Sequence, residues 1–298
     1  MAAKRSDTPT NLCCPVHSVN RMNKRFRDLR HFVLDMDGTI YNGQTLFPHT
    51  RPFLALLSDL GIGYTFLTNN PSKNRADYLA HLRKLGVAAR PEQIYTSAHA
   101  TIEYLHEKWP QVRRLFVLGT ASMCREFAAA DFALLPEDPA QEPDAVIVGF
   151  DTALKFSRLC RAAWWIKRGK PYFATNPDRV CPTDQPTVLV DCGSICAALE
   201  RATGVAPAAV LGKPDPAMIR GILHKHSLKP HQLAMVGDRL YTDITMAHRA
   251  RVLGVLVLTG EATATEAAAF VPPPDLIVSR LDELAARLLA ARGKEVPA

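Results

Sequence analysis

Two acidic residues near the start of the sequence have the types and spacing that acid–base or metal chemistry requires. Asp35 and Asp37 follow an apolar run over residues 32–34, and Gly38 comes directly after them. Residues i and i+2 of an extended strand point to one side, so both carboxylates would face the same spot where the strand ends. Two like charges this close require a nearby cation or a proton on one of them. An incidental Asp-Gly turn or a calcium loop is the alternative interpretation of these residues alone.

Three polar residues follow the next apolar run. Thr68, Asn69 and Asn70 come directly after residues 63–67, and hydroxyl and amide groups at such a position can donate hydrogen bonds to phosphate oxygens. A helix that begins near Asn74 would add the positive end of its dipole. The alternative is an ordinary connection between a strand and a helix, in which these residues only cap the helix.

A lysine is the next candidate. Lys213 lies in a Gly-Lys-Pro turn that precedes a predicted helix. A lysine held at such a position could neutralise the negative charge of a phosphoryl group during its transfer. A lysine that is merely solvated is the alternative for a turn of this kind.

The last candidates are a second pair of acids. Asp238 follows the apolar run 233–236, and Asp243 comes about one helical turn later. Magnesium prefers oxygen ligands and usually retains several waters. We therefore expect Asp238 and Asp35 to be magnesium ligands. Asp243 is expected to support these ligands without binding the ion itself.

Short apolar runs alternate with amphipathic segments along the chain, which favours an α/β fold with a parallel sheet and helices on both of its faces. The predicted strands cover residues 31–34, 63–67, 115–118, 145–148, 172–174, 233–236 and 255–258. The predicted helices cover residues 51–60, 74–85, 122–130, 156–167, 194–202 and 216–226. Ligands of such sheets bind beyond the carboxyl ends of the strands, so the candidate residues are expected to meet there.

The order of these residues resembles the haloacid dehalogenase (HAD) superfamily, whose four motifs are DxDGT, Ser or Thr, Lys, and GDxxxxD. They stand here as residues 35–39, Thr68, Lys213 and residues 237–243, and the resemblance covers roughly residues 30 to 290. It implies a Rossmann-like core with a parallel sheet. The motifs are jointly specific because each falls at the end of a predicted strand or in a turn.

For the site, the resemblance implies a two-step phosphoryl transfer. Asp35 would attack phosphorus to form an aspartyl-phosphate, and Asp37 would protonate the leaving oxygen and then accept a proton from water. Magnesium would be bound by Asp35, the backbone carbonyl of Asp37, and Asp238, with Asp243 in support. The phosphoryl oxygens would be bound by Thr68, Asn69, Asn70 and Lys213.

The lengths of chain between the motifs place a second domain. Only one helix and one strand fit between Thr39 and Thr68, whereas the stretch from Thr68 to Lys213 is far longer than core connections need. A smaller α/β cap domain is therefore expected between the second and third motifs. The predicted parts are a basic, flexible tail (1–28), a first core segment (29–108), the cap (109–205), a second core segment (206–292) and a C-terminal tail (293–298).

Three further stretches, residues 174–178, 193–204 and 212–216, resemble the NagD or 4-nitrophenylphosphatase-like branch of this superfamily, class IIA. In that branch an α/β cap closes over the site, which implies that Asn176, Asp178 and Cys181 face the leaving group. Pyridoxal phosphate phosphatases of the branch usually have His where Cys181 falls, which weighs against that substrate.

One departure from the branch precedes the last cap helix. Relatives usually read Pro-Gly-x-Gly at this point, whereas residues 190–193 read Val-Asp-Cys-Gly. Asp191 either adds an acid near the pocket or caps the helix predicted to start at Ser194, since Asp is a common capping residue.

The resemblance implies a magnesium-dependent phosphatase of small phosphomonoesters, namely sugar, polyol or nucleoside monophosphates. The alternatives are a phosphotransferase or phosphomutase that uses the same intermediate, and a binding protein that kept the fold without turnover. A homo-oligomer assembled through the cap domain is compatible with the resemblance, because relatives often dimerise in this way.

Composition limits the partners. The chain has 298 residues, 47% of them hydrophobic and 22% charged, which is typical of a soluble globular protein, and no apolar run approaches a membrane helix. The net charge of +7 is concentrated in residues 1–30, which predicts a solvated basic tail rather than a nucleic-acid-binding face. Seven cysteines without a Cys-x-x-Cys pair favour reduced thiols in a cytoplasmic protein. A small phosphorylated metabolite is the expected partner.

Overall fold

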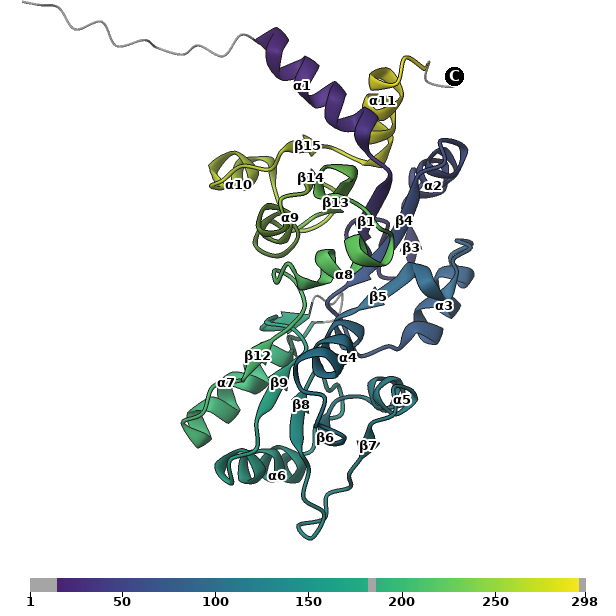
Figure 1. Cartoon of the computed structure of the whole chain (residues 1–298). Coiled ribbons are helices and arrows are strands. Elements are labelled where there is room, and N and C mark those ends of the chain that lie inside the picture. Colours follow the sequence, from purple (N-terminus) through teal and green to yellow (C-terminus); the bar gives the residue numbers. More distant parts are fainter. Residues whose placement is uncertain (1–14, 182–185, 295–298) are drawn as a thin grey trace, which may run out of the picture.

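The computed structural model describes residues 15–181 and 186–294; residues 1–14, 182–185 and 295–298 lie outside this description. Figure 1 shows two α/β units, one above the other, each built around its own sheet. The upper unit, the core, contains both ends of the described chain, and the lower unit, the cap, comes from its middle. The predicted α/β core with an inserted α/β cap is therefore confirmed.

Six parallel strands form the core sheet, in the order β15 (Leu276–Val278), β14 (Leu253–Val257), β13 (Leu233–Gly237), β1 (His31–Asp35), β4 (Gly63–Thr68) and β5 (Ile94–Thr96). β1 lies inside the sheet, between β13 and β4. All five of its residues are buried. A strand buried on both faces requires an unbroken apolar run, which is why this segment does not alternate with polar residues.

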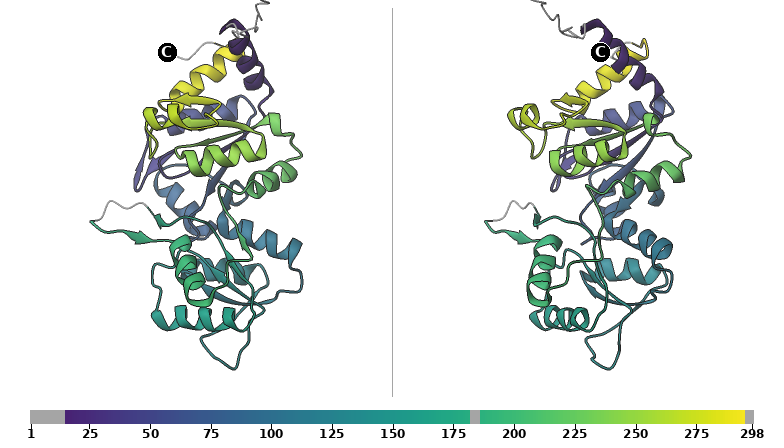
Figure 2. Two further views of the ribbon diagram at one scale, coloured as in Figure 1. Left: turned by 90° about the vertical axis from the view of Figure 1, so that its left-hand side faces the viewer. Right: turned by 60° about the vertical axis from the view of Figure 1, so that its left-hand side comes forward.

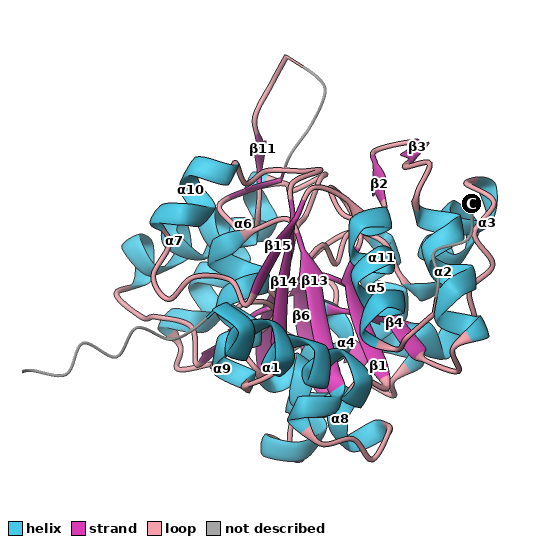
Figure 3. Cartoon of the chain, turned by 90° about the horizontal axis from the view of Figure 1, so that it is seen from above, coloured by secondary structure: helices cyan, strands magenta, loops and turns pink. Residues whose placement is uncertain are grey.

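Helices cover both faces of the core sheet, as Figure 3 shows. The core helices are α1 (Pro15–Asp28), α2 (Thr50–Asp59), α3 (Arg75–Lys84), α8 (Ala217–Lys225), α9 (Thr245–Ala250), α10 (Ala264–Ala269) and α11 (Leu281–Ala291). Phe32 and Leu34 of β1 pack in one apolar cluster with residues of α2 and α11. Val33, on the opposite face, packs with residues of α8 and α9. The alternation of β1 side chains thus holds the two helical layers on the sheet.

Five parallel strands form the cap sheet, in the order β12 (Ala209–Val210), β9 (Tyr172–Ala174), β8 (Ala145–Val148), β6 (Arg114–Leu118) and β7 (Ala133–Leu134). The helices packed against it are α4 (Ser97–Lys108), α5 (Ala121–Ala129), α6 (Phe156–Lys167) and α7 (Cys192–Thr203). The predicted cap range of 109–205 is too narrow, because β12 completes this sheet and α4 packs into its apolar cluster.

Two short hairpins and three helical turns complete the described chain. The hairpins are β2 (Tyr41–Asn42) with β3 (Thr45–Leu46), and β10 (Val180–Cys181) with β11 (Leu189–Val190). In both views of Figure 2 the β10–β11 hairpin projects from the cap at the level where the two units meet. The turns are η1 (Pro91–Gln93), η2 (Pro230–Gln232) and the π-type turn η3 (Leu240–Ile244). The β10–β11 hairpin is therefore placed to contribute to a site between the units.

The strands and helices predicted from periodicity lie where they were expected. Residues 145–148, 172–174 and 156–167 match β8, β9 and α6 in full. The predicted strands at 31–34 and 63–67 each extend by one residue, to Asp35 and Thr68. Within residues 15–181 and 186–294, no helix is both long and apolar enough to cross a membrane.

The prediction of a flexible tail over residues 1–28 is wrong for residues 15–28, which form α1; residues 1–14 lie outside the described chain. Figure 1 shows α1 lying against α11 at the top of the core. Phe26 is only 1% exposed and belongs to the core cluster. Arg25 Nη1 lies 2.6 Å from Asp275 Oδ1, and Arg292 donates to the carbonyl of Phe26 at 3.1 Å. Contacts with the far end of the chain, which the local sequence does not reveal, hold this basic helix in place.

We predict that Phe26→Ala lowers the free energy of unfolding by about 3–5 kcal/mol, because removal of a fully buried ring leaves a cavity in the core. Lys24→Ala, on the exposed side of the same helix, is expected to change it by less than about 0.5 kcal/mol. Urea denaturation of both variants measures the difference. Equal stability of the two variants would show that α1 does not contribute to the core.

Candidate active site

Residues of the first three motifs line one small cavity of about 50 Å³ between the core sheet and the cap. Of the fourth motif only Arg239 lines it, whereas Asp238 and Asp243 lie outside the described lining. The core contributes residues from the carboxyl ends of β1 and β4 and from the loops before α8 and after β13. The cap contributes residues from the β10–β11 hairpin and its flanks. The lining residues are Asp35, Asp37, Thr68, Asn69, Asn70, Asp178, Val180, Cys181, Asp191, Lys213 and Arg239.

A buried cation joins the carboxylates at the centre of the site. Lys213 is 3% exposed; its Nζ contacts Asp35 Oδ1 and lies 2.7 Å from Asp243 Oδ1. Asp243 Oδ2 also accepts from the backbone N–H of Arg239 at 3.1 Å. The two carboxylates raise the pKa of Lys213 above its ordinary value, despite burial, which acts in the opposite direction. Lys213 is therefore a permanent cation beside the carboxylate of Asp35.

Three carboxylates form a group that fits a divalent cation. Asp35, Asp238 and Asp243 each offer an oxygen within 4.8 Å of the others. Asp238 Oδ2 accepts from the backbone N–H of Glu261 at 2.8 Å, whereas the buried Oδ1 has no hydrogen-bond partner among the described residues. Burial, and then the charges of Asp35 and Asp243, raise the pKa of Asp238. An all-oxygen donor set with an unpaired buried carboxylate oxygen suits Mg²⁺.

Glycines make room around Asp238. Gly38 has φ +85°, a left-handed conformation that favours glycine, and a Cβ there would collide with the Asp238 carboxylate. A Cβ on Gly260 would collide with the same carboxylate. The backbone thus approaches Asp238 from two sides, which encloses the group of carboxylates.

Asp37 lies beyond the end of β1 and is the exposed member of the first motif. Its Oδ1 accepts from the backbone N–H of Gly43 at 3.2 Å. Desolvation within the pocket, together with the charge of Asp35, raises the pKa of Asp37. A carboxyl group that holds its proton more tightly than usual is suited to act as a general acid.

Thr68 and Asn70 form the floor of the cavity. Thr68 Oγ1 accepts from the backbone N–H of Asn70 at 3.2 Å, and a hydroxyl that accepts a hydrogen bond can also donate one. The backbone carbonyl of Asn70 accepts from Tyr78 at 2.8 Å, and the Asn70 amide lies 3.7 Å from Cys181 Sγ. Both residues line the cavity, and their binding of a phosphoryl group stays a prediction.

Asn69 has a different position from the one expected, although it lines the cavity. Its Nδ2 donates to Asp178 Oδ2 at 3.1 Å and to the carbonyl of Lys213 at 3.0 Å. Its Oδ1 accepts from the backbone N–H of Lys213 at 2.7 Å. Both amide protons therefore have protein partners, and the side chain joins β4, the Lys213 turn and the cap.

We predict that Asn69→Ala lowers the free energy of unfolding by at least about 2 kcal/mol, because two buried backbone groups of Lys213 lose their partner. The same change should lower kcat, since the turn no longer holds Lys213 in place. Urea denaturation and steady-state kinetics measure both effects. Asn42→Ala, an exposed position on β2, is the matched control, and equal behaviour of the two variants would contradict the prediction.

Asn176 does not line the cavity. It is 0% exposed, its Nδ2 donates to the carbonyl of Asn69 at 3.2 Å, and its Oδ1 accepts from the backbone N–H of Asp178 at 2.9 Å. The expectation that Asn176 faces the leaving group is thus corrected: it anchors the cap segment on the core, and Asp178 is the residue that reaches the cavity.

Asp191 fulfils both of the roles that the sequence left open. It caps α7, which begins two residues earlier than predicted, by accepting from the backbone N–H of Cys192 at 2.5 Å. It also lines the cavity, although it is only 2% exposed. Burial raises the pKa of Asp191 to about 7, and the neighbouring Asp178 adds to this effect.

Arg239 lines the cavity and was not among the predicted residues. Its Nε lies 3.0 Å from Glu261 Oε2, and its charge lowers the pKa values of Asp37, Asp178 and Asp191. The only signal in the sequence is that a basic residue directly follows Asp238. That signal is weak, because the partner Glu261 lies in a distant loop.

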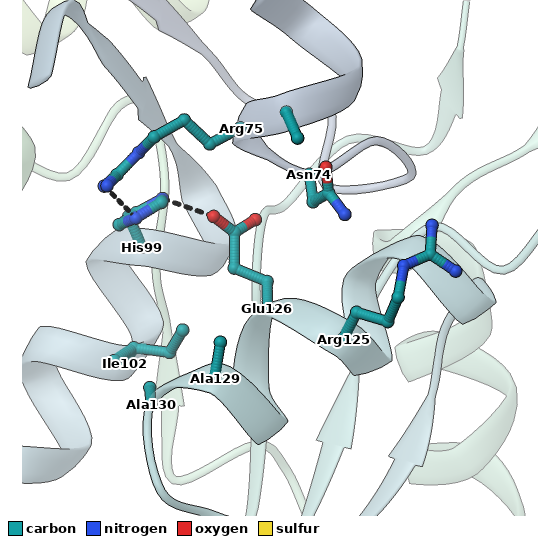
Figure 4. Close-up of a pocket in the computed structure, with 9 residues that line it drawn as sticks. Asn74, Arg75, His99, Ile102, Arg125, Glu126, Ala129 and Ala130 are labelled. Atoms are coloured by element: carbon teal, nitrogen blue, oxygen red, sulfur yellow. Dashed lines mark hydrogen bonds and ion pairs between the residues drawn. The ribbon is translucent and has the colours of Figure 1, made fainter. Parts of the chain in front are cut away.

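A larger cavity, of about 450 Å³, lies outside the motif residues, between α3, α4 and α5. Figure 4 shows its polar wall, where His99 lies between Arg75 and Glu126. His99 Nδ1 is 2.9 Å from Glu126 Oε1, and His99 Nε2 contacts Arg75. These contacts join a core helix to a cap helix, so the larger cavity belongs to the junction of the two units rather than to the catalytic group.

Comparison with known protein families agrees with this geometry. The model for "Haloacid dehalogenase-like hydrolase" matches residues 32–133, and a second HAD-hydrolase-like model matches residues 210–284. The two matched segments lie on either side of most of the cap, and together they contain all four motifs.

Individual relatives cover most of the chain. The crystal structure of a 4-nitrophenylphosphatase from Thermotoga maritima has a TM-score of 0.82 and 36% identity, and the match covers 88% of this chain and 98% of that one. Ribonucleotide monophosphatase NagD of Escherichia coli (strain K12) is 31% identical over 78% of this chain and 88% of its own. A glycerol phosphate phosphatase of Mycobacterium tuberculosis, in complex with magnesium, has a TM-score of 0.80 and 31% identity over 87% of this chain and 78% of its own.

The level of identity and the coverage agree with the geometry, in which Asp35 both lines the cavity and belongs to the carboxylate group with Asp238 and Asp243. The parallel core sheet and the inserted parallel cap sheet are also shared with the related solved structures. The chain therefore belongs to the haloacid dehalogenase-like hydrolases, in their NagD and 4-nitrophenylphosphatase branch, and is a phosphatase of that family.

Proposed function

We propose that this protein is a magnesium-dependent phosphatase of small phosphomonoesters that works through an aspartyl-phosphate on Asp35. The observation that carries the proposal is the meeting of Asp35, Asp37, Thr68 and Lys213 around one cavity at the carboxyl ends of β1 and β4. Sugar, polyol and nucleoside monophosphates are the proposed substrates. Relatives are named as a ribonucleotide monophosphatase, a glycerol phosphate phosphatase and an acid sugar phosphatase.

In the first step, an oxygen of Asp35 forms a bond to phosphorus as the bond from phosphorus to the leaving oxygen breaks. Asp37 gives its proton to that oxygen, so that the alcohol leaves neutral. Thr68 donates a hydrogen bond to the phosphoryl group, and the Lys213 ammonium stabilises its negative charge. The raised pKa of Asp37 supports its role as the acid.

In the second step, water attacks the phosphorus of the aspartyl-phosphate, and the bond from phosphorus to Asp35 breaks. Asp37, now a carboxylate, takes the proton of the attacking water and is thereby restored.

Asp35, Asp238 and the backbone carbonyl of Asp37 would hold the magnesium ion, with Asp243 supporting them. When bound, the ion supplies positive charge that stabilises the phosphoryl oxygens. The group of three carboxylates and the unpaired Asp238 Oδ1 support this assignment. Asp243 is already bound to Lys213, which supports its place behind the ligands.

The test is phosphate release across a panel of phosphomonoesters that includes 4-nitrophenyl phosphate. We expect turnover with Mg²⁺, loss of turnover with a chelator, and recovery when Mg²⁺ is added back.

Mg²⁺ at 100 times its Kd should also stabilise the folded protein by about 2.7 kcal/mol, and Asp238→Asn should reduce this stabilisation. Turnover that persists without any divalent cation would contradict the metal assignment. A folded protein that binds Mg²⁺ but releases no phosphate from any ester would contradict the function; release only with a second alcohol present would indicate phosphotransfer.

A further inference from the structure

The cap presents an acidic surface to the part of the cavity that receives the leaving group. Four described cap residues line the cavity, namely Asp178, Val180, Cys181 and Asp191. Two of the four are carboxylic acids, and none of the four is basic. On the core side, Lys213 is bound to Asp35 and Asp243. Arg239 is the remaining basic residue of the lining; it is paired with Glu261, and its charge also acts on Asp178 and Asp191.

Asp191 is held firmly in this position. Its Oδ1 accepts from the backbone N–H of Cys192 at 2.5 Å, at the first turn of α7. Its own backbone N–H donates to the carbonyl of Arg179 at 3.0 Å. These contacts orient the Asp191 carboxylate at the cavity wall.

Asp178 is oriented in a similar way. Its Oδ2 accepts from Asn69 at 3.1 Å, and its backbone N–H donates to Asn176. A carboxylate has about four acceptor positions, so hydrogen bonds to the protein leave capacity for a ligand. Burial raises the pKa values of both acids, and Asp178 adds to the effect on Asp191. A further negative charge is therefore unfavourable here, whereas hydroxyl or ammonium donors would be stabilised.

We propose that Asp191, together with Asp178, restricts the enzyme to phosphomonoesters whose alcohol portion is uncharged or cationic, and excludes those whose alcohol carries a carboxylate or a second phosphate. This inference rests on the proposed function and specifies its substrate class.

The test compares kcat/KM for two esters of similar size, glycerol 3-phosphate and 3-phosphoglycerate, which differ in a hydroxymethyl group and a carboxylate. Ethanolamine phosphate adds the cationic case. We expect the wild type to prefer glycerol 3-phosphate and ethanolamine phosphate to 3-phosphoglycerate.

Asp191→Asn keeps an oxygen for the α7 cap but removes the charge. It should lower the ratio of kcat/KM for glycerol 3-phosphate to kcat/KM for 3-phosphoglycerate by at least about tenfold. A change of this size is expected when one like charge is removed from a partly buried site.

Asp178→Asn should shift the ratio in the same direction, and it keeps the test valid if Asp191→Asn does not fold. Asp138→Asn is the matched control, since Asp138 belongs to the cap but does not line the cavity; its ratio should equal that of the wild type. A wild-type preference for 3-phosphoglycerate, or an unchanged ratio in both folded variants, would overturn this inference alone. No turnover of 4-nitrophenyl phosphate by the wild type would overturn the proposed function and this inference with it.

Discussion

Asp35→Asn is expected to lower kcat by roughly 10⁴- to 10⁶-fold, the range typical of removing a catalytic nucleophile. An amide does not form the acyl-phosphate that the first step requires, so the chemistry stops before the alcohol leaves. The protein should still fold, because Lys213 keeps its contact with Asp243 at 2.7 Å. Phosphate release from 4-nitrophenyl phosphate measures the loss, and thermal unfolding of the variant measures folding.

Asp138→Asn serves as the control for this change as well, because it removes an acid from the cap without altering the cavity. Acid quenching during turnover of the wild type should trap phosphate on the protein, and peptide mapping should place it on Asp35. Activity of Asp35→Asn within tenfold of the wild type, or a phosphate trapped on another residue, would disprove the nucleophile assignment.

Lys213→Met is expected to lower the free energy of unfolding by about 3–5 kcal/mol in the absence of metal, because it leaves buried carboxylates without their cation. Turnover should also fall by at least about 10²–10³-fold, since the phosphoryl group loses a preorganised positive charge. Mg²⁺ should recover part of the stability, because it compensates the same carboxylates, but not the activity.

The sign of the pH dependence follows from the pKa values. Burial raises the pKa of Asp243 to about 6, and Lys213 opposes this rise, so removing Lys213 raises the pKa further in the folded state. A carboxyl with a raised folded-state pKa contributes stability at low pH and loses it as pH rises through that pKa. The destabilisation should therefore be larger at pH 8 than at pH 5. Urea denaturation at both pH values tests this, with the exposed Lys108→Met as control. Equal losses at both pH values would show that charge is not the cause.

Local sequence was sufficient to predict that Asp35, Thr68 and Asp238 lie at one edge of the core sheet. Asp35, Thr68 and Asp238 each end an apolar run, and the parallel sheet brings the ends of such runs to one edge. The strands were found for the same reason, since burial on both faces requires continuous apolar residues. The structure adds the distances that turn this shared edge into a cavity.

The positions of Arg239, Asn176 and α1 were not predicted from the sequence, because they depend on contacts between segments that are far apart in the chain. Arg239 is held by Glu261 from another loop, and Asn176 is turned towards the carbonyl of Asn69 instead of the cavity. α1 is rich in basic residues, and only its packing against α11 shows that it is part of the core. Such contacts cannot be predicted from a short stretch of sequence, because each depends on a partner residue far along the chain.

The order in which the core strands pair has a consequence for synthesis on the ribosome. β1 lies between β4, which follows it closely in the chain, and β13, which is made some two hundred residues later. α1 likewise can pack only after α11 has been synthesised, and Arg25 can pair with Asp275 only after that residue has been synthesised. The cap sheet, by contrast, is built from one continuous stretch. The nascent cap can therefore complete its hydrophobic core while the first half of the catalytic unit is still without partners.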